Sequence, residues 1–141
     1  MPLHLQELSC DHSAPRLARA WVRLVLEDVE PSNGPWPGDI VPDVVMCASE
    51  LVTTSLIASS TAMTLRLSAE PDLVRLSLVD DSPILTNTGD DSRLHVQNLS
   101  FRLIEAYSSA CGINPEGHGR ELWALFRKRE PTTVDPIDIG G

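Results

Sequence analysis

The sequence has few aromatic residues and few basic residues. The first shortage limits the composition of the core, and the second limits the classes of partner that the chain can bind. Aromatic residues make up 4% of the 141 positions, so the core must be built mainly from Leu, Val, Ile and Ala. The chain has 11 Lys and Arg residues against 20 Asp and Glu residues, for a net charge of −9 at pH 7. The longest basic run, Arg127–Arg129, is followed at once by Glu130. Because such a surface repels phosphate backbones and anionic lipids, we expect neither nucleic-acid nor membrane binding.

Cysteines and long apolar runs are also scarce. Cys10, Cys47 and Cys111 are odd in number and form no Cys-x-x-Cys pair, which suits free thiols in a reducing compartment. Cys10, His12 and His118 lack the spacing of a four-ligand metal site, so no metal is expected. The N-terminus has no basic leader, and we expect no stretch that reaches the ~18 apolar residues of a spanning helix. These features predict a cytoplasmic protein.

The composition is that of an ordinary globular domain. Hydrophobic residues make up 42% and charged residues 22%. A chain of this length buries roughly two-thirds of its unfolded surface, so it needs no disulfide or metal for stability. We expect one domain over residues 1–130 and a loose tail over 131–141, which is rich in proline and glycine.

Hydrophobic periodicity predicts an α+β fold. Alternating apolar residues predict an edge strand, a hairpin and a last strand: 3–8, 63–69, 73–80 and 120–128. Apolar residues at intervals of three and four predict three helices, which begin at about 14, 39 and 97 and end at about 29, 59 and 110. Asn114–Gly119 is expected to be a turn. This order predicts a two-layer sandwich, with a mixed, mostly antiparallel sheet and helices on one face.

Local signals mark the starts of two of the helices. Ser13 is expected to cap the first helix, with Pro15 in its first turn, and Asp39 is expected to cap the second. Residues 31–38 form a connector rich in turn residues. In the last strand, Leu122, Ala124 and Phe126 would lie on one face, with Trp123 and Leu125 on the other. Three explanations are open: both faces of the strand are buried in the core, the strand assignment is off by one residue, or one face is a surface for a second copy or a partner.

Two acidic residues stand out from these patterns. Val74, Leu76 and Leu78 point to the buried face of their strand, so Asp80 is expected to point the same way. A buried carboxylate needs a hydrogen-bond partner. The alternative is that Asp80 and its neighbour Asp81 only cap a turn. Glu50 lies on the second predicted helix, beside its apolar stripe, where most glutamates are simply solvated.

The string Glu50–Thr54 (Glu-Leu-Val-Thr-Thr), followed by a hairpin that ends Val79–Pro83 (Val-Asp-Asp-Ser-Pro), resembles the GHKL ATPase superfamily. The chain is most similar to the small bacterial anti-sigma factor serine kinases with a histidine-kinase-like, Bergerat-type ATPase domain. The likeness runs from the first strand through Ala14–Arg19 to Gly119–Ala124, so it covers nearly the whole chain. It implies the same α+β fold, an ATP site and a protein partner.

The resemblance assigns roles to four residues of these two motifs. Glu50 matches the family's glutamate, the base that polarises the attacking group. Thr54 stands where the family has an asparagine that holds Mg²⁺ against the triphosphate. Asp80 matches the aspartate that accepts from the adenine amine, and Ser82 matches the small residue two positions later. The adenine end of the site is therefore kept in part, while its metal ligand is replaced.

The phosphate end departs further from the family. Asn98 and Ser100 stand where the family has two glycines that open a helix around the phosphates, and Glu121 stands where it has a threonine. Backbone N–H groups approach phosphate closely only where side chains are absent. Asp90 and Asp91, in the segment that matches the family's lid, would repel a nucleotide. We therefore interpret the chain as a degenerate kinase-like fold.

Three functions are compatible with this interpretation. The first is a regulatory protein without catalysis that binds a sigma factor or an anti-sigma antagonist, as a homodimer or otherwise, with no cofactor or only weakly bound ATP or ADP. The second is a working ATP-dependent serine/threonine kinase. The third is a small-molecule sensor that uses the vacated pocket.

Overall fold

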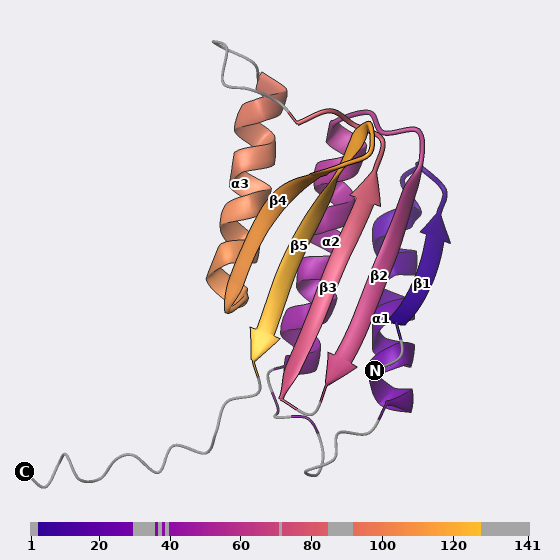
Figure 1. Ribbon diagram of the computed structural model, residues 1–141, viewed down its shortest axis with the longest axis vertical. Coiled ribbons are helices and arrows are strands. Elements are labelled where there is room, and N and C mark those ends of the chain that lie inside the picture. The colour runs from indigo at the N-terminus through magenta and orange to yellow at the C-terminus, as the bar shows by residue number, and fades with distance from the viewer. Residues whose placement is uncertain are drawn as a thin grey trace, which may run out of the picture.

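The described part of the chain folds into two layers, one of five strands and one of three helices (Figure 1). In this computed structural model the described residues are 3–29, 36, 38, 40–70, 72–84 and 92–127, with the backbone alone for 92–98. The elements in chain order are β1 (Leu3–Leu8), α1 (Ala14–Asp28), α2 (Ile40–Ile57), β2 (Met63–Glu70), β3 (Leu73–Asp80), α3 (Ser92–Tyr107), β4 (Ala110–Glu116) and β5 (Gly119–Arg127). The predicted α+β class, edge strand and hairpin are confirmed.

The described strands form one sheet in the order β1-β2-β3-β5-β4, and every neighbouring pair in it is antiparallel. The expectation of a mixed sheet is therefore wrong. A helix that connects two neighbouring strands directly leaves them parallel. Here β4 follows α3 and reverses the chain before β5, so β5 runs antiparallel to β3.

Strand β4 was not expected, because its sequence has no alternation and contains turn-forming residues. Gly112 and Asn114 favour turns, and Pro115 cannot donate to a ladder, so it is tolerated at a sheet edge. β4 is an edge strand. A Cβ at Gly112 would lie 2.6 Å from the Trp123 ring, so this glycine makes room for the indole on the neighbouring strand. The predicted turn is confined to Gly117 and His118, and Gly117 has a φ of 59°.

Helix α3 begins and ends earlier than the predicted range of 97–110. It starts at Ser92 and stops at Tyr107, where Ser108 N donates to Ile104 O at 3.0 Å. Ser109 N then donates to Leu125 O at 2.7 Å, so the chain has turned into the sheet by that residue. This backbone bond replaces the last helical turn that the apolar spacing favoured.

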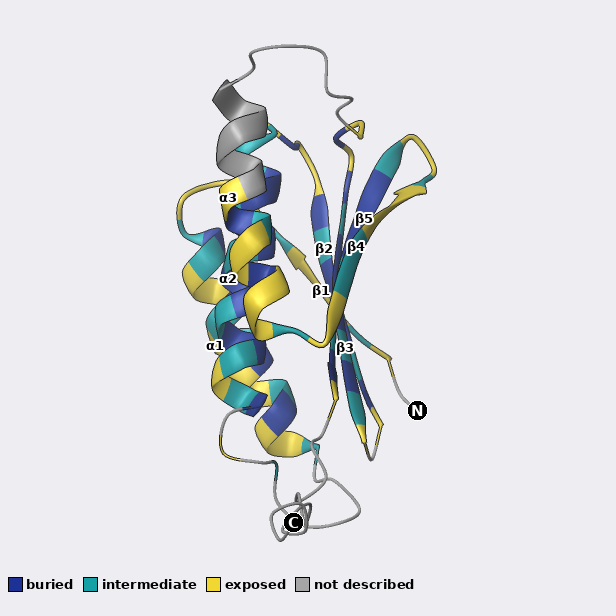
Figure 2. Ribbon diagram, turned by 90° about the vertical axis from the view of Figure 1, so that its left-hand side faces the viewer, coloured by how far each residue is buried: buried dark blue, intermediate teal, exposed yellow. Residues whose placement is uncertain are grey.

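The helices cover one side of the sheet, and the core lies between the two layers (Figure 2). Strand residues that point to the helices are buried, and their neighbours on the open side are mostly partly exposed, as the alternation predicts. Ser77 and Glu121 are the exceptions, because both are buried on the open side. In β5, Leu122, Ala124 and Phe126 belong to the core, whereas Trp123 and Leu125 lie on the open side. The last strand is therefore not shifted by one residue from its predicted position, and only one face of β5 belongs to the core.

Helix α2 is the central helix of the helical layer, since it contacts α1, α3, β3 and β5. It is 18 residues long with a mean hydropathy of 1.6, which by length and composition alone is enough to cross a membrane. The expectation that no stretch reaches this length is therefore wrong. Half of this helix is buried within the domain, as is typical of a core helix that is apolar on most sides.

The start of α1 differs in one contact from the prediction. Ser13 stands at the N-cap and Pro15 follows in the first turn, but the Ser13 side chain makes no capping hydrogen bond. Instead Ser13 N donates to the Asp11 carboxylate at 2.8 Å, and the hydrogen bonds from Ser13 lower the pKa of Asp11. The predicted cap at Asp39, the lid residues Asp90 and Asp91, most of the connector 31–38 and the tail 131–141 lie outside the described residues.

Candidate functional site

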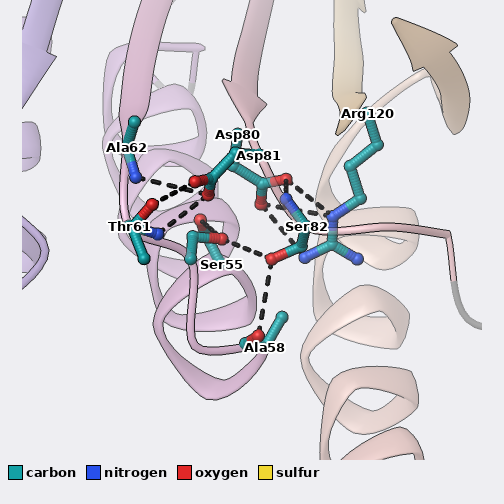
Figure 3. A network of polar contacts seen from close by, with 9 residues as sticks. Ser55, Ala58, Thr61, Ala62, Asp80, Asp81, Ser82 and Arg120 are labelled. Carbon is teal, nitrogen blue, oxygen red and sulfur yellow. Dashed lines mark hydrogen bonds and ion pairs between the residues drawn. The ribbon is translucent and has the colours of Figure 1, made fainter. Parts of the chain in front are cut away.

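Asp80 and Arg120 form a buried ion pair at the end of the sheet (Figure 3). They are direct cross-strand partners on β3 and β5. Arg120 Nε lies 3.0 Å and 3.2 Å from the two oxygens of Asp80, and Nη2 lies 3.1 Å from Oδ2. The side chains are 0% and 2% exposed for Asp80 and Arg120. The predicted inward orientation of Asp80 is confirmed, and Arg120 is the main hydrogen-bond partner of its carboxylate.

Sequence reasoning missed Arg120, although one signal was available. Arg120 stands two residues before Leu122, so the alternation of β5 already places it on the buried face. A buried arginine is almost always paired. What the sequence lacks is the pairing of β3 with β5, which brings residues 80 and 120 together from distant parts of the chain.

A chain of serine hydroxyls connects this ion pair to the end of α2. Ser55 Oγ donates to Ser60 Oγ at 2.9 Å, and Ser60 Oγ lies 2.6 Å from Ser82 Oγ. Ser82 N donates to Asp80 Oδ1 at 3.1 Å. All three serines are buried, so Asp80 and Ser82, which the sequence singled out together, belong to one hydrogen-bonded cluster. Figure 3 shows this cluster between the strand ends and α2.

Asp81 takes the turn-capping role that was the alternative for both aspartates. Its carboxylate accepts from Thr61 N at 2.8 Å, from Ala62 N at 3.3 Å and from the Thr61 hydroxyl. These bonds, that from the Thr61 side chain above all, lower the pKa of Asp81. The two adjacent carboxylates therefore have different roles. Asp81 accepts hydrogen bonds from the exposed backbone at residues 61 and 62, and Asp80 forms the buried ion pair with Arg120.

Glu50 and Thr54 lie one turn apart on α2, as expected. Thr54 is 1% exposed, and its hydroxyl donates to the backbone oxygen of Glu50 at 2.9 Å. This proton is therefore committed to the helix. Glu50 is partly exposed. Thr53 makes the same kind of bond to Ser49 O at 2.8 Å, so the hydroxyls of this stretch bond locally to their own helix.

Asn98 and Ser100, which stand where the family has two phosphate-binding glycines, lie inside a helix rather than at its start. α3 begins at Ser92, well before Asn98 and Ser100. The free N–H groups of a helix belong to its first turn, so those of residues 98 and 100 fall within the hydrogen-bonded part. Ser100 is buried at 7% exposure. The arrangement therefore offers no open amide cradle at these two positions.

Glu121 lies on the opposite side of the sheet from Asp80. Its carboxylate accepts from Arg75 Nη1 at 2.9 Å and from Nη2 at 3.3 Å, and Arg66 Nη1 lies 3.9 Å away. The hydrogen bond from Arg75 is the main reason that the pKa of Glu121 is lowered. The structure thus does not bring Glu121 together with Asp80 and Ser82.

Within the described ranges, no group of three or more His, Cys, Asp and Glu side chains is placed to hold a metal ion. All three cysteines are free thiols. Burial raises the pKa of Cys47 to about 12 and also raises that of Cys10, to which Asp81 and Asp80 contribute.

Comparisons with known proteins bear on the fold. No protein-family model matches the sequence, and no curated protein matches it either. Among solved structures, the chain is similar to the crystal structure of the RsbU and RsbW domains of Rv1364c from Mycobacterium tuberculosis, with a TM-score of 0.65 and 18% sequence identity. The match covers 90% of this chain and 32% of that chain, so this chain spans about a third of the other's length. The two proteins share their fold over nearly the whole of the present chain.

Proposed function

We propose that this chain is a regulatory protein of the anti-sigma factor type, which has a histidine-kinase-like ATPase fold and acts by binding another protein. The observation that carries the proposal is the state of Thr54. At the position where the resemblance implies a magnesium ligand, this side chain is 1% exposed and its hydroxyl donates to Glu50 O at 2.9 Å. Mg²⁺ requires several oxygen ligands in nearly octahedral geometry and usually keeps several of its waters, and a hydroxyl oxygen on a side chain that is 1% exposed leaves no room for such a hydrated ion.

The phosphate end supports the same conclusion. Asn98 and Ser100 lie within α3 after its first turn, where backbone N–H groups are already used by the helix. The residues present at these positions therefore do not fit Mg·ATP. The likeness in fold to a structure that contains an RsbW domain supports a role in anti-sigma regulation.

The partner is a sigma factor or an anti-sigma antagonist. The chain carries a net charge of −9, so a partner with a basic surface is steered toward it. Electrostatic steering raises the association rate more than the affinity, and salt screens it over about 8 Å at physiological ionic strength. The association rate constant should therefore fall as salt rises.

The experiment uses a panel of purified sigma factors and anti-sigma antagonists from the source organism. Binding of each to the wild type and to Glu50→Gln is measured by biolayer interferometry at two salt concentrations, with and without Mg·ATP. We expect one panel member to bind both proteins equally, without a nucleotide requirement. Phosphoryl transfer to a panel member that Glu50→Gln abolishes would overturn the proposal in favour of the kinase, and nucleotide-dependent release without transfer would favour the sensor.

A further inference from the structure

The strongest unused feature of the molecule is the guanidinium of Arg120. It is among the largest fully buried side chains, in a core that is otherwise made mainly of Leu, Val, Ile and Ala. Removing a charge from water is expensive, and a buried charge is tolerated only when its partner and additional hydrogen bonds are well placed. Arg120 meets this condition with one residue, Asp80, through three N–H···O contacts of 3.0 to 3.2 Å.

These contacts engage both oxygens of the Asp80 carboxylate, whose side chain is 0% exposed. Oδ1 accepts from Arg120 Nε and from Ser82 N, and Oδ2 accepts from Arg120 Nε and Nη2. Any ligand that offers N–H groups to this carboxylate must first displace the guanidinium. Displacement would leave a buried cation without its partner, which is the costly way to break such a pair.

We propose that Arg120 is an internal ligand of Asp80, which fills and closes a site for a planar, nitrogen-rich group such as a guanidinium, an amidine or an aminopurine. The inference rests on the proposed function, under which the former nucleotide site is not used. Under this inference, the side chain of Arg120 by itself keeps a ligand away from Asp80. This effect does not depend on Thr54 or on residues 98 and 100.

The backbone around Arg120 fixes where its side chain can go. A Cβ at Gly119 would lie 1.9 Å from Asp80 O, so β5 presses against the end of β3 at the preceding residue. This close approach places Arg120 directly across from Asp80. Shortening the side chain would leave a hole whose wall includes the carboxylate of Asp80 and the backbone N–H of Ser82. A polar hole of this kind suits a planar cation better than an apolar ligand.

The test removes the internal ligand and offers a substitute. Arg120→Ala is titrated with ethylguanidinium and, separately, with adenosine, and binding is followed by thermal unfolding and by calorimetry. Ethylguanidinium should stabilise Arg120→Ala saturably at millimolar concentration and bind it at least a hundredfold more tightly than it binds the wild type. Adenosine should also bind Arg120→Ala more tightly than the wild type, but with a smaller difference in affinity. Its amino group stands beside a ring nitrogen that accepts hydrogen bonds, so it donates to only one oxygen of the carboxylate.

Two control variants assign the effect to the carboxylate. The double variant Asp80→Asn/Arg120→Ala should lose the response, since a neutral amide does not pair with a cation. Arg75→Ala, which removes an arginine paired with Glu121 on the open side of the sheet, should show no response. If Arg120→Ala does not fold alone, ethylguanidinium should restore its folding, and the longer neutral variant Arg120→Gln is titrated in the same way.

The proposal is overturned if neither Arg120 variant is stabilised by either probe, or if the wild type responds as strongly as the variants do. It is equally overturned if the double variant keeps the response. These measurements use purified protein without a partner. A failure of partner binding in the panel experiment would therefore leave this result intact, and a failure here would leave partner binding intact.

Discussion

Arg75 and Glu121 form a bidentate ion pair on the side of the sheet that no described helix covers. Arg75 Nη1 lies 2.9 Å from Oε2 of Glu121, and Nη2 lies 3.3 Å from Oε1. The guanidinium also lies over the Trp123 ring, 6.0 Å from its centroid. Although this side of the sheet is open, the Glu121 side chain is only 9% exposed. The pair therefore behaves as part of the folded structure rather than as a loose surface contact.

This pair predicts how stability depends on pH. The pKa of Glu121 is lowered, chiefly by its hydrogen bond from Arg75, whereas an unfolded glutamate titrates at about pH 4.3. A lowered folded-state pKa gives stability that is present above the unfolded pKa and is lost as pH falls through the folded pKa. Glu121→Gln should therefore cost about 1 kcal/mol at pH 7 and progressively less at acidic pH, as measured by urea unfolding at several pH values.

Glu27→Gln, on the exposed side of α1, serves as the control for this experiment. It should change the free energy of unfolding little at any pH. A Glu121→Gln difference that stays constant from neutral to acidic pH would contradict the assignment of Glu121 as a carboxylate whose pKa is held down by Arg75.

The buried pair of Asp80 and Arg120 predicts strong coupling in a double-mutant cycle. Replacement of either residue alone leaves the other charge buried without its partner, and we expect each of Asp80→Leu and Arg120→Met to cost about 3–5 kcal/mol. The double replacement removes both charges and should cost much less than the sum. Urea unfolding of the four proteins measures the coupling, and additive losses would show that the pair is not the unit of stability.

The fold could be predicted where the pattern is local. Alternation from Met63 to Ala69 and from Val74 to Leu78 defines the hairpin, and the same parity turns Asp80 inward. β4 could not be predicted in this way, because Gly112 and Pro115 serve packing and edge position rather than alternation. The spacing of apolar residues predicted helix α2 correctly. Spacing does not measure mean hydropathy, however, so it did not indicate that this helix is as long and as apolar as a membrane-spanning segment.

The candidate site shows the same division between local and distant information. The sequence associates Asp80 with Ser82, and Glu50 with Thr54, because each pair lies within one element or its turn. Arg120 escapes notice because its partner is set by the order of strands, which no single segment encodes. The residue next to it, Glu121, was assigned by resemblance to the nucleotide site, yet strand parity directs it to the other side of the sheet.

The thiol of Cys47 should be unreactive in the folded protein. It is 0% exposed, and burial raises its pKa to about 12, so the thiolate that attacks labelling reagents is nearly absent at pH 8. Cys10 and Cys111 are partly exposed. Mass spectrometry after brief iodoacetamide treatment should find Cys47 labelled at least about a hundredfold more slowly than Cys10, with the difference lost in denaturant. Equal rates in the native protein would mean that α2 opens readily.

Restoring the amide at position 54 should not by itself restore binding of Mg·ATP. Thr54→Asn supplies the oxygen that the resemblance implies for Mg²⁺, but Asp80 remains paired with Arg120 and residues 98 and 100 remain within α3. Isothermal titration of the wild type and of Thr54→Asn with Mg·ATP should therefore show no saturable binding in the micromolar range, with the folded state of each verified by circular dichroism. Micromolar binding by the wild type would show that the site still accepts nucleotide as it stands. Micromolar binding gained by Thr54→Asn alone would show that one ligand, and not the closed carboxylate or the helical phosphate positions, is what the chain has lost.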